Sequence, residues 1–180
     1  MSTSIQQSSD ASIVSQICDT YKLTIAEFNT LRERSSAAKA TAYCPYSQFR
    51  VGATLLAGDG SYIDGANVEN ASYPVGTCAE RVAFGKAVTE GKKGFRAVAV
   101  ATDISPPASP CGMCRQFIRE FCDLSTPIIM FDKDQAFVVL RLEQVCTLLV
   151  PVYLPSTDSY TWLAHEAYNA RSHHESRLSG

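Results

Sequence analysis

The sequence contains no long apolar run, which excludes one class of protein. Its longest nearly apolar stretch, residues 146–154, is nine residues long and is interrupted by Thr147 and Pro151. A helix that crosses a bilayer needs about 20 consecutive apolar residues. We therefore predict no membrane partner for this chain.

Positive charge is not in excess either. Lys and Arg total 16, Asp and Glu total 18, and the formal net charge is −2. A protein that binds duplex nucleic acid usually needs a basic surface to neutralise the phosphates. The charge balance therefore predicts no nucleic-acid partner.

Cysteine is too sparse for a disulfide scaffold. The chain has seven cysteines in 180 residues, an odd number, whereas secreted disulfide-rich domains are shorter and richer in cysteine. The first residues, MSTSIQQSSDAS, lack the basic segment and apolar core of a secretory signal. These observations predict a reducing, cytoplasmic location, where clustered cysteines more often bind metal or take part in chemistry.

The composition is that of a folded chain, with 46% hydrophobic and 19% charged residues. A length of 180 residues favours one domain. We divide the chain into a disordered, Ser- and Gln-rich N-terminal tail at 1–12, one folded catalytic domain at 13–150, and an atypical, partly disordered C-terminal extension at 151–180.

Periodicity and turn residues predict alternating helices and strands. Thr24 and Glu27 have the spacing of a capping box, and Gly65 within an apolar segment predicts a bulge or a close backbone approach. The order fits an α/β fold, a three-layer α/β/α sandwich around a mixed five-stranded sheet. The predicted helices are 24–41, 78–90, 111–123 and 142–149, and the predicted strands are 49–57, 61–68, 95–102, 127–132 and 136–141.

Two short cysteine motifs carry the candidate chemistry. Cys78-Ala-Glu80 is followed by Pro110-Cys111-Gly-Met-Cys114, with Cys111 33 residues after Cys78. Cys111 and Cys114 are three residues apart, so on a helix they share a face and can hold one ion. Cys78 and Cys111 each lie where a loop enters a predicted helix, and the partial positive charge there favours thiolates. Three protein ligands leave a fourth position open, as catalytic zinc sites do.

Glu80 and Arg81 belong to the same motif. In the first turn of a helix the Glu80 side chain leans toward the helix N-terminus, which places its carboxylate beside the ion without ligating it. Three thiolates and Zn²⁺ leave a net charge near −1, which two helix N-termini and Arg81 would offset. A solvated helix cation remains the plainer alternative for Arg81.

Two other interpretations of the cysteines stay open. A structural zinc site would be closed by a fourth ligand from Cys44, Cys122, Cys146 or a histidine, and the motif cysteines could also be buried thiols without metal. The nearby Glu80 and Pro110 favour the catalytic interpretation. The remaining cysteines, which we predict to be buried or incidental, are Cys18, Cys44, Cys122 and Cys146.

The sequence resembles the homotetrameric, three-cysteine cytidine deaminases of pyrimidine salvage, over about residues 24–149. The resemblance implies zinc-dependent hydrolysis of cytidine and 2′-deoxycytidine to uridine and 2′-deoxyuridine with release of ammonia. It also implies a homotetramer. The matching text is Ala42-Tyr-Cys-Pro-Tyr-Ser-Gln-Phe49, Val51-Gly-Ala53, Gly65-Ala-Asn67-Val-Glu69-Asn-Ala71, Tyr73-Pro74, Cys78-Ala-Glu-Arg81 and Ser109-Pro-Cys-Gly-Met-Cys-Arg-Gln116.

The resemblance further implies the role of each matching residue. Asn67 and Glu69 would hold the ribose hydroxyls, and their spacing agrees, because residues two apart on a strand face the same way. A polar strand end is the plainer alternative for this pair. The other implied roles are zinc binding by Cys78, Cys111 and Cys114, proton transfer by Glu80, packing of Phe49 against the pyrimidine, a backbone hydrogen bond from Ala79 to the base carbonyl, contact of Tyr73 with a neighbouring subunit's site, and hydrogen bonds from Arg81 to the ligand thiolates.

After Leu149 the chain departs from the family pattern. Family members usually continue to a Phe-Gly-Pro element whose Phe reaches an adjacent subunit's site, whereas this chain reads Leu148-Leu-Val-Pro-Val-Tyr-Leu-Pro155. Tyr153 or Trp162 could replace that aromatic, although a packing or tail role is the plainer interpretation. Because of this departure, the alternative function of a zinc-binding but catalytically impaired homologue stays open. A nucleic-acid editing deaminase is disfavoured by the acidic charge balance and by the lack of a basic and aromatic stripe.

Overall fold

The computed structural model describes residues 4–147, which form a six-stranded mixed sheet in the order β1-β6-β5-β4-β2-β3. Strands β4 and β5 pair in parallel, and the other neighbours pair antiparallel. The strands are β1 (Gln6–Gln7), β2 (Val51–Ala57), β3 (Tyr62–Ala66), β4 (Phe95–Thr102), β5 (Pro127–Phe131) and β6 (Ala136–Arg141).

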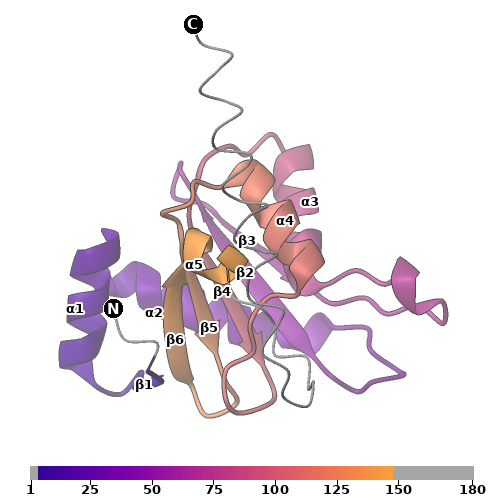
Figure 1. Ribbon diagram of the computed structural model, residues 1–180, viewed down its shortest axis with the longest axis horizontal. Coiled ribbons are helices and arrows are strands. Elements are labelled where there is room, and N and C mark those ends of the chain that lie inside the picture. The colour runs from indigo at the N-terminus through magenta and orange to yellow at the C-terminus, as the bar shows by residue number, and fades with distance from the viewer. Residues whose placement is uncertain (1–3, 148–180) are drawn as a thin grey trace, which may run out of the picture. The chain divides into compact units, whose positions relative to one another are not determined.

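Helices cover both faces of this sheet, with α1 and α2 on one face and α3, α4 and α5 on the other (Figure 1). The predicted α/β/α sandwich is therefore confirmed. The helices are α1 (Ala11–Tyr21), α2 (Ile25–Ala38), α3 (Ala79–Thr89), α4 (Gly112–Phe121) and α5 (Leu142–Thr147), with two 3₁₀ turns, η1 (Lys39–Thr41) and η2 (Tyr73–Val75).

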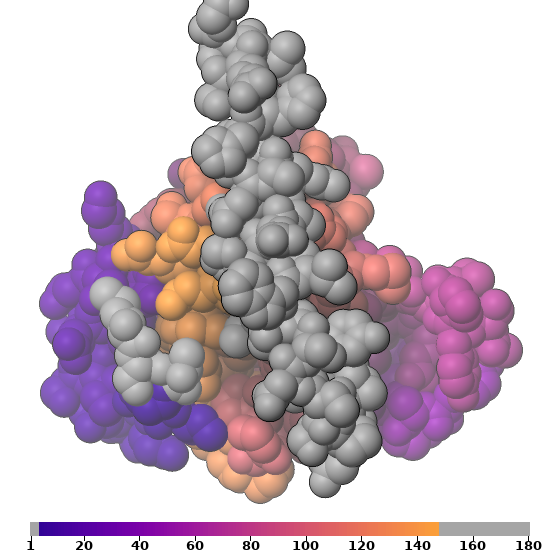
Figure 2. Space-filling view, viewed as in Figure 1, coloured from indigo at the N-terminus to yellow at the C-terminus, as the bar shows by residue number. Residues whose placement is uncertain are grey.

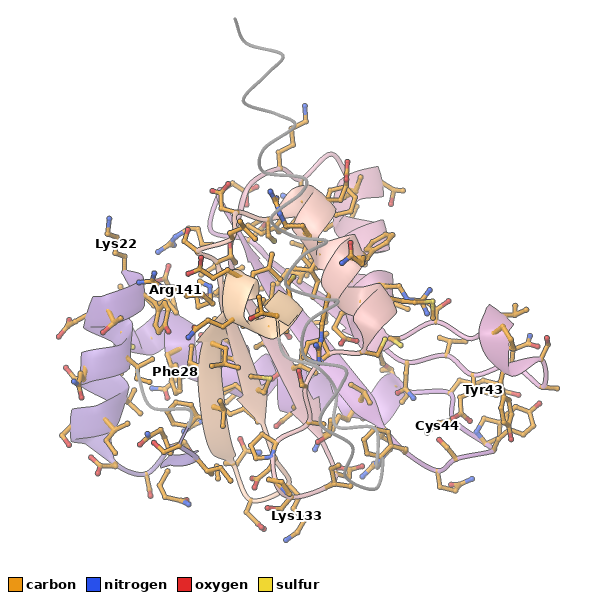
Figure 3. The ribbon with its side chains drawn as sticks, viewed as in Figure 1. Lys22, Phe28, Tyr43, Cys44, Lys133 and Arg141 are labelled. Atoms are coloured by element: carbon orange, nitrogen blue, oxygen red, sulfur yellow. The ribbon has the colours of Figure 1, made fainter. Side chains whose placement is uncertain are left out.

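Alternation along the central strands builds two separate apolar cores. In β4, Val98 and Val100 pack toward α3 and α4, while Ala97 and Ala99 pack toward α1 and α2. Successive strand side chains point to opposite faces, so a continuous apolar run supplies both cores at once. Phe28 of α2 lies in the second core and is fully buried (Figure 3).

Two local predictions hold at residue level. The Thr24 hydroxyl accepts from the Glu27 N–H, and the Glu27 carboxylate accepts from the Thr24 N–H, which is a complete capping box. At Gly65 an added Cβ would lie 2.5 Å from the Ala83 nitrogen. Glycine at position 65 therefore allows α3 to lie directly on β3, and the close-approach interpretation of this residue is correct.

The described part of the N-terminal region, residues 4–12, differs from the expectation of a disordered tail over residues 1–12. Residues 6–7 form β1 on the edge of β6, and α1 begins at Ala11, with Asp10 capping its first turn by accepting from Ser12 and Ile13. This sixth strand is the difference from the predicted five. Helix α1 is a second difference, since no helix was predicted before residue 24. A two-residue strand has no periodicity to detect, whereas the apolar side chains of α1 do follow helical spacing, so this helix was detectable from the sequence.

The predicted C-terminal extension, with Tyr153 and Trp162, lies outside the described residues. Within residues 4–147, none of the helices combines the length and apolar character needed to cross a membrane.

Candidate active site

Three thiols meet where two helices begin. Cys78 is the N-cap residue of α3 and Cys111 is the N-cap residue of α4, and Cys114 lies in the first turn of α4. The Sγ atoms of Cys78 and Cys111 are 3.8 Å apart, and the three Sγ atoms all lie within 4.8 Å of one another. Residues far apart in the sequence are therefore brought together as the motif spacing predicts.

The donor set suits a zinc ion. Zn–S bonds are about 2.3 Å long, so two thiolates in a tetrahedral site sit about 3.8 Å apart. The Cys78–Cys111 separation of 3.8 Å matches this value. Soft thiolate ligands favour zinc over magnesium or calcium, which prefer oxygen donors.

The first turns of α3 and α4 add positive potential at this point. Neither the Cys78 nor the Cys111 side chain hydrogen-bonds to its own helix as a cap, so the first-turn N–H groups retain their partial positive charge. A hydrogen bond from Cys114, helped by Arg81, lowers the pKa of the Cys78 thiol to about 5, against the opposing effect of burial. The same hydrogen bond, burial and the nearby Glu80 raise the pKa of Cys114. One thiol therefore ionises readily, and full ionisation of the cluster needs a cation.

Arg81 approaches the cluster from the first turn of α3. Its Nη2 atom donates to the Gly76 carbonyl at 3.1 Å and lies 3.9 Å from the Cys78 Sγ. Burial lowers the pKa of Arg81, but the Cys78 thiolate more than offsets this effect. Its buried Nε atom has no hydrogen-bond partner among residues 4–147. The arrangement agrees with a guanidinium that faces ligand thiolates rather than with a solvated helix cation.

Glu80 is buried beside the thiols, with a relative exposure of 4%. Burial raises the pKa of its carboxyl group, and the Cys78 thiolate raises it further. A carboxyl group that holds its proton at higher pH than usual is suited to accept and return protons near neutrality. A buried carboxylate without a structural ion pair is also typical of a functional site.

A pocket of about 380 Å³ opens next to the cluster, which is within the size range of small-molecule sites. It brings Cys78 and Arg81 to the same cavity as three of the predicted substrate contacts, Asn67, Glu69 and Tyr73. The other lining residues are Tyr46, Ser47, Val68, Asn70, Gly76, Thr77 and Met113.

Two long loops form the wall of this pocket. Tyr43 pairs through its backbone with Asn67 and Glu69, and Val68 pairs in turn with Thr77. These pairings hold the loop after η1 against the loop after β3. Tyr43 and Cys44, labelled in Figure 3, lie in the loop after η1.

Asn67 and Glu69 are both already engaged by the first loop. The Asn67 amide accepts from the Val51 N–H and donates to the Phe49 carbonyl, each at 2.8 Å. The Glu69 carboxylate accepts from the backbone N–H groups of Tyr46 and Ser47 and from the Ser47 hydroxyl. Both side chains therefore shape the loop as well as facing the cavity.

The remaining predicted contacts occupy different positions. Ala79 is fully buried at the start of α3, and Phe49 is half-buried and lies outside the set of lining residues. Tyr73 is 77% exposed, and its ring centroid lies 6.3 Å from that of Tyr46. Nothing within one chain covers the outer face of this tyrosine in the described residues.

Of the lining residues that sequence reasoning did not assign a role, Ser47 and Met113 are two examples. Both lie inside matched motifs, but neither has a residue type that signals chemistry by itself. Only the contact between Ser47 and Glu69, which are 22 residues apart, identifies the serine.

The other cysteines do not join the cluster. Cys18, Cys44 and Cys122 are buried, Cys146 is half-buried, and all seven cysteines are free thiols. Among the residues that the structure describes, the metal-binding group contains only the three motif cysteines. The interpretation as a structural site closed by a fourth cysteine is therefore not supported there.

Comparison with known proteins gives a consistent answer. The family model described as the cytidine and deoxycytidylate deaminase zinc-binding region matches residues 27–130. Over 96 residues the chain is 52% identical to the cytidine deaminase of Sporosarcina psychrophila, which covers 53% of this chain and 71% of that protein. Over 93 residues it is 50% identical to the cytidine deaminase of Halalkalibacterium halodurans, covering 52% and 70%.

A solved structure agrees with the sequence relatives. The crystal structure of cytidine deaminase from Burkholderia pseudomallei superposes with a TM-score of 0.63 at 37% identity, covering 65% of this chain and 94% of that one.

Proposed function

The chain belongs to the cytidine and deoxycytidylate deaminase family, and from this we propose that it hydrolyses cytidine and 2′-deoxycytidine to uridine and 2′-deoxyuridine, with release of ammonia, in pyrimidine salvage. The observation that carries the proposal is the three-thiol cluster with buried Glu80 beside it, next to a pocket of about 380 Å³ that Cys78 helps to line.

Cys78, Cys111 and Cys114 would hold the zinc ion of this family. Bound zinc supplies a Lewis acid that makes a water molecule nucleophilic near neutral pH. The two helix N-termini and Arg81 stabilise the thiolates that the ion requires.

Glu80 is the residue that we propose moves protons. Its raised pKa lets it accept a proton from the attacking water and deliver it to N3 of the base. The water oxygen adds to C4, and Glu80 then moves the remaining proton of that hydroxyl to the amino group, so that the C4–N bond breaks, ammonia leaves and C4 keeps the oxygen as a carbonyl. Because the carboxyl is enclosed, the proton is not lost to bulk solvent between the two transfers.

The proposed substrate contacts come from the pocket wall, in Asn67 and Glu69, and from two residues outside the set of lining residues, Phe49 and Ala79. Glu69 and Asn67 bind the ribose hydroxyls, Phe49 packs against the pyrimidine, and the Ala79 N–H donates to the base carbonyl. The support is the position of Asn67 and Glu69 on the cavity and of Ala79 in the first turn of α3, where helix N–H groups lack internal acceptors.

Zinc analysis with an activity assay tests the proposal. Purified full-length protein is expected to hold about one zinc per chain and to lower the absorbance of cytidine as uridine forms. Zinc without turnover would favour the impaired homologue. Well-folded protein without zinc would contradict the assignment of the three cysteines.

The impaired homologue is not favoured, because Glu80 is intact and the named relatives are cytidine deaminases.

We also propose that the protein works as a homotetramer in the cytoplasm. The free state of all seven cysteines suits a reducing compartment. The two pocket-wall loops expose apolar side chains that a partner subunit would cover. The segment near residue 75 extends away from the strands in Figure 1 and forms the magenta lobe at the right of Figure 2. The exposed apolar residues of this surface are Tyr43, Tyr46, Val68, Tyr73 and Val75.

Val75→Glu is expected to shift the protein from a tetramer to smaller species, because it places a charge in an apolar contact. Val75 is 65% exposed in the single chain, so the variant should still fold. Light scattering after size exclusion measures the change. Val88→Glu, at an exposed position near the end of α3, is the matched control and should remain tetrameric. A tetrameric V75E variant would show that this surface is not the interface.

A further inference from the structure

The Ser47 hydroxyl joins two groups on the pocket wall. It donates to Oε1 of Glu69 and accepts from the Phe49 N–H at 3.0 Å. The direction of both bonds is determined, because an ionised carboxylate only accepts and a backbone N–H only donates. A serine has a single hydroxyl proton, and here that proton is committed to Glu69.

The three donors to Glu69 leave a defined opening on its carboxylate. Oε2 accepts from the N–H groups of Tyr46 and Ser47 at 3.0 and 3.2 Å, which uses both of its lone pairs. Among residues 4–147, Oε1 accepts only the Ser47 hydroxyl, so one lone pair remains for a ligand hydroxyl. The Ser47 hydrogen bond also lowers the pKa of Glu69 and keeps it an acceptor.

The loop that carries Ser47 is held in a costly conformation. Gln48, the next residue, has a φ of +57°, in the left-handed region that non-glycine residues rarely adopt. Its backbone N–H donates to the Cys44 carbonyl, and its side chain donates to the Pro45 carbonyl at 2.8 Å. Such strain persists only where surrounding contacts hold the backbone, and it is frequent at binding sites.

We propose that Ser47 is a positioning residue that orients Glu69 toward the sugar of the substrate. This inference rests on the proposed function, since it assigns the ribose contact to Glu69. Ser47 does not touch the reacting atoms. It selects which carboxylate oxygen is open and prevents the side chain from rotating away from the cavity.

Ser47→Ala is expected to raise KM for cytidine roughly tenfold, as small misplacements of a binding group do, with kcat changed less than about twofold. For 2′,3′-dideoxycytidine, which lacks the secondary hydroxyls, KM should change less than about twofold. Ser47→Thr keeps the hydroxyl and should restore the wild-type KM. In a Glu69→Gln background, Ser47→Ala should have little further effect, because the partner is already altered.

Ser61→Ala is the matched control. The Ser61 hydroxyl donates to the Asp59 carboxylate at 2.6 Å in the β2–β3 turn, which is the same chemistry away from the pocket. Its kinetics should equal those of the wild type.

Two results overturn the inference while the proposed function stands: an unchanged KM for cytidine in S47A, or an equal loss with cytidine and dideoxycytidine. Wild-type protein that fails to deaminate cytidine would overturn the proposed function and this inference together.

Discussion

Glu80→Gln is expected to lower kcat about 10²- to 10⁴-fold while the zinc content stays at the wild-type value. Glutamine has nearly the same shape but cannot accept and return a proton. The carboxyl group is buried, and the carboxylate among the described pocket-lining side chains, Glu69, has a lowered pKa and therefore cannot take over this role. Water cannot easily replace Glu80 in an enclosed site, so the loss should be large.

Steady-state kinetics with cytidine and metal analysis on the same preparation measure these two effects. Glu90→Gln is the matched control, because Glu90 is an exposed residue that caps the other end of α3. It should have wild-type kinetics. Near-normal turnover in the Glu80→Gln variant would show that another group carries the protons.

Cys114→Ala is expected to remove both zinc and activity. Cys114 is fully buried and lies within 4.8 Å of the other two thiols, so its loss leaves two ligands, one of them the exposed Cys111. Two thiolates hold zinc far more weakly than three, and the open position for water would be poorly defined. Emission spectrometry should find less than about one tenth of an equivalent of zinc, and turnover should be undetectable.

Cys146→Ala is the control that shows whether the loss of zinc is specific to Cys114 or follows the removal of any cysteine. Cys146 is half-buried in α5 and is one of the residues that a closed structural site would have used. Full zinc content in this variant is expected. Loss of zinc from Cys146→Ala, or full zinc in Cys114→Ala, would contradict the three-ligand assignment.

Most of the fold was predictable because its signals are local. Three patterns each predict the structure at their own position: the capping box of Thr24 and Glu27, the continuous apolar run of β4, and the glycine at 65. The element β1 escaped prediction for the opposite reason. Two residues joined to β6 across more than 100 positions leave no pattern in the sequence.

The metal centre was also predictable, since residue type and spacing carry its chemistry. Two cysteines three apart at a helix start, with a third at another helix start, define the donors before any coordinate is known. The arrangement of the pocket wall was less predictable from the sequence. The sequence indicated Asn67 and Glu69 as ribose contacts, but it did not indicate that the same side chains hold the backbone of residues 46–51.

The sequence by itself determined the order of helices and strands from residue 24 onward, the three thiols and the acid beside them, because periodicity and ligand chemistry act over short spans. The tertiary structure alone decided the burial that raises the pKa of Glu80 and the contact that makes Ser47 important. Both depend on which distant segments meet, since desolvation and side-chain hydrogen bonds are properties of the neighbours that folding supplies.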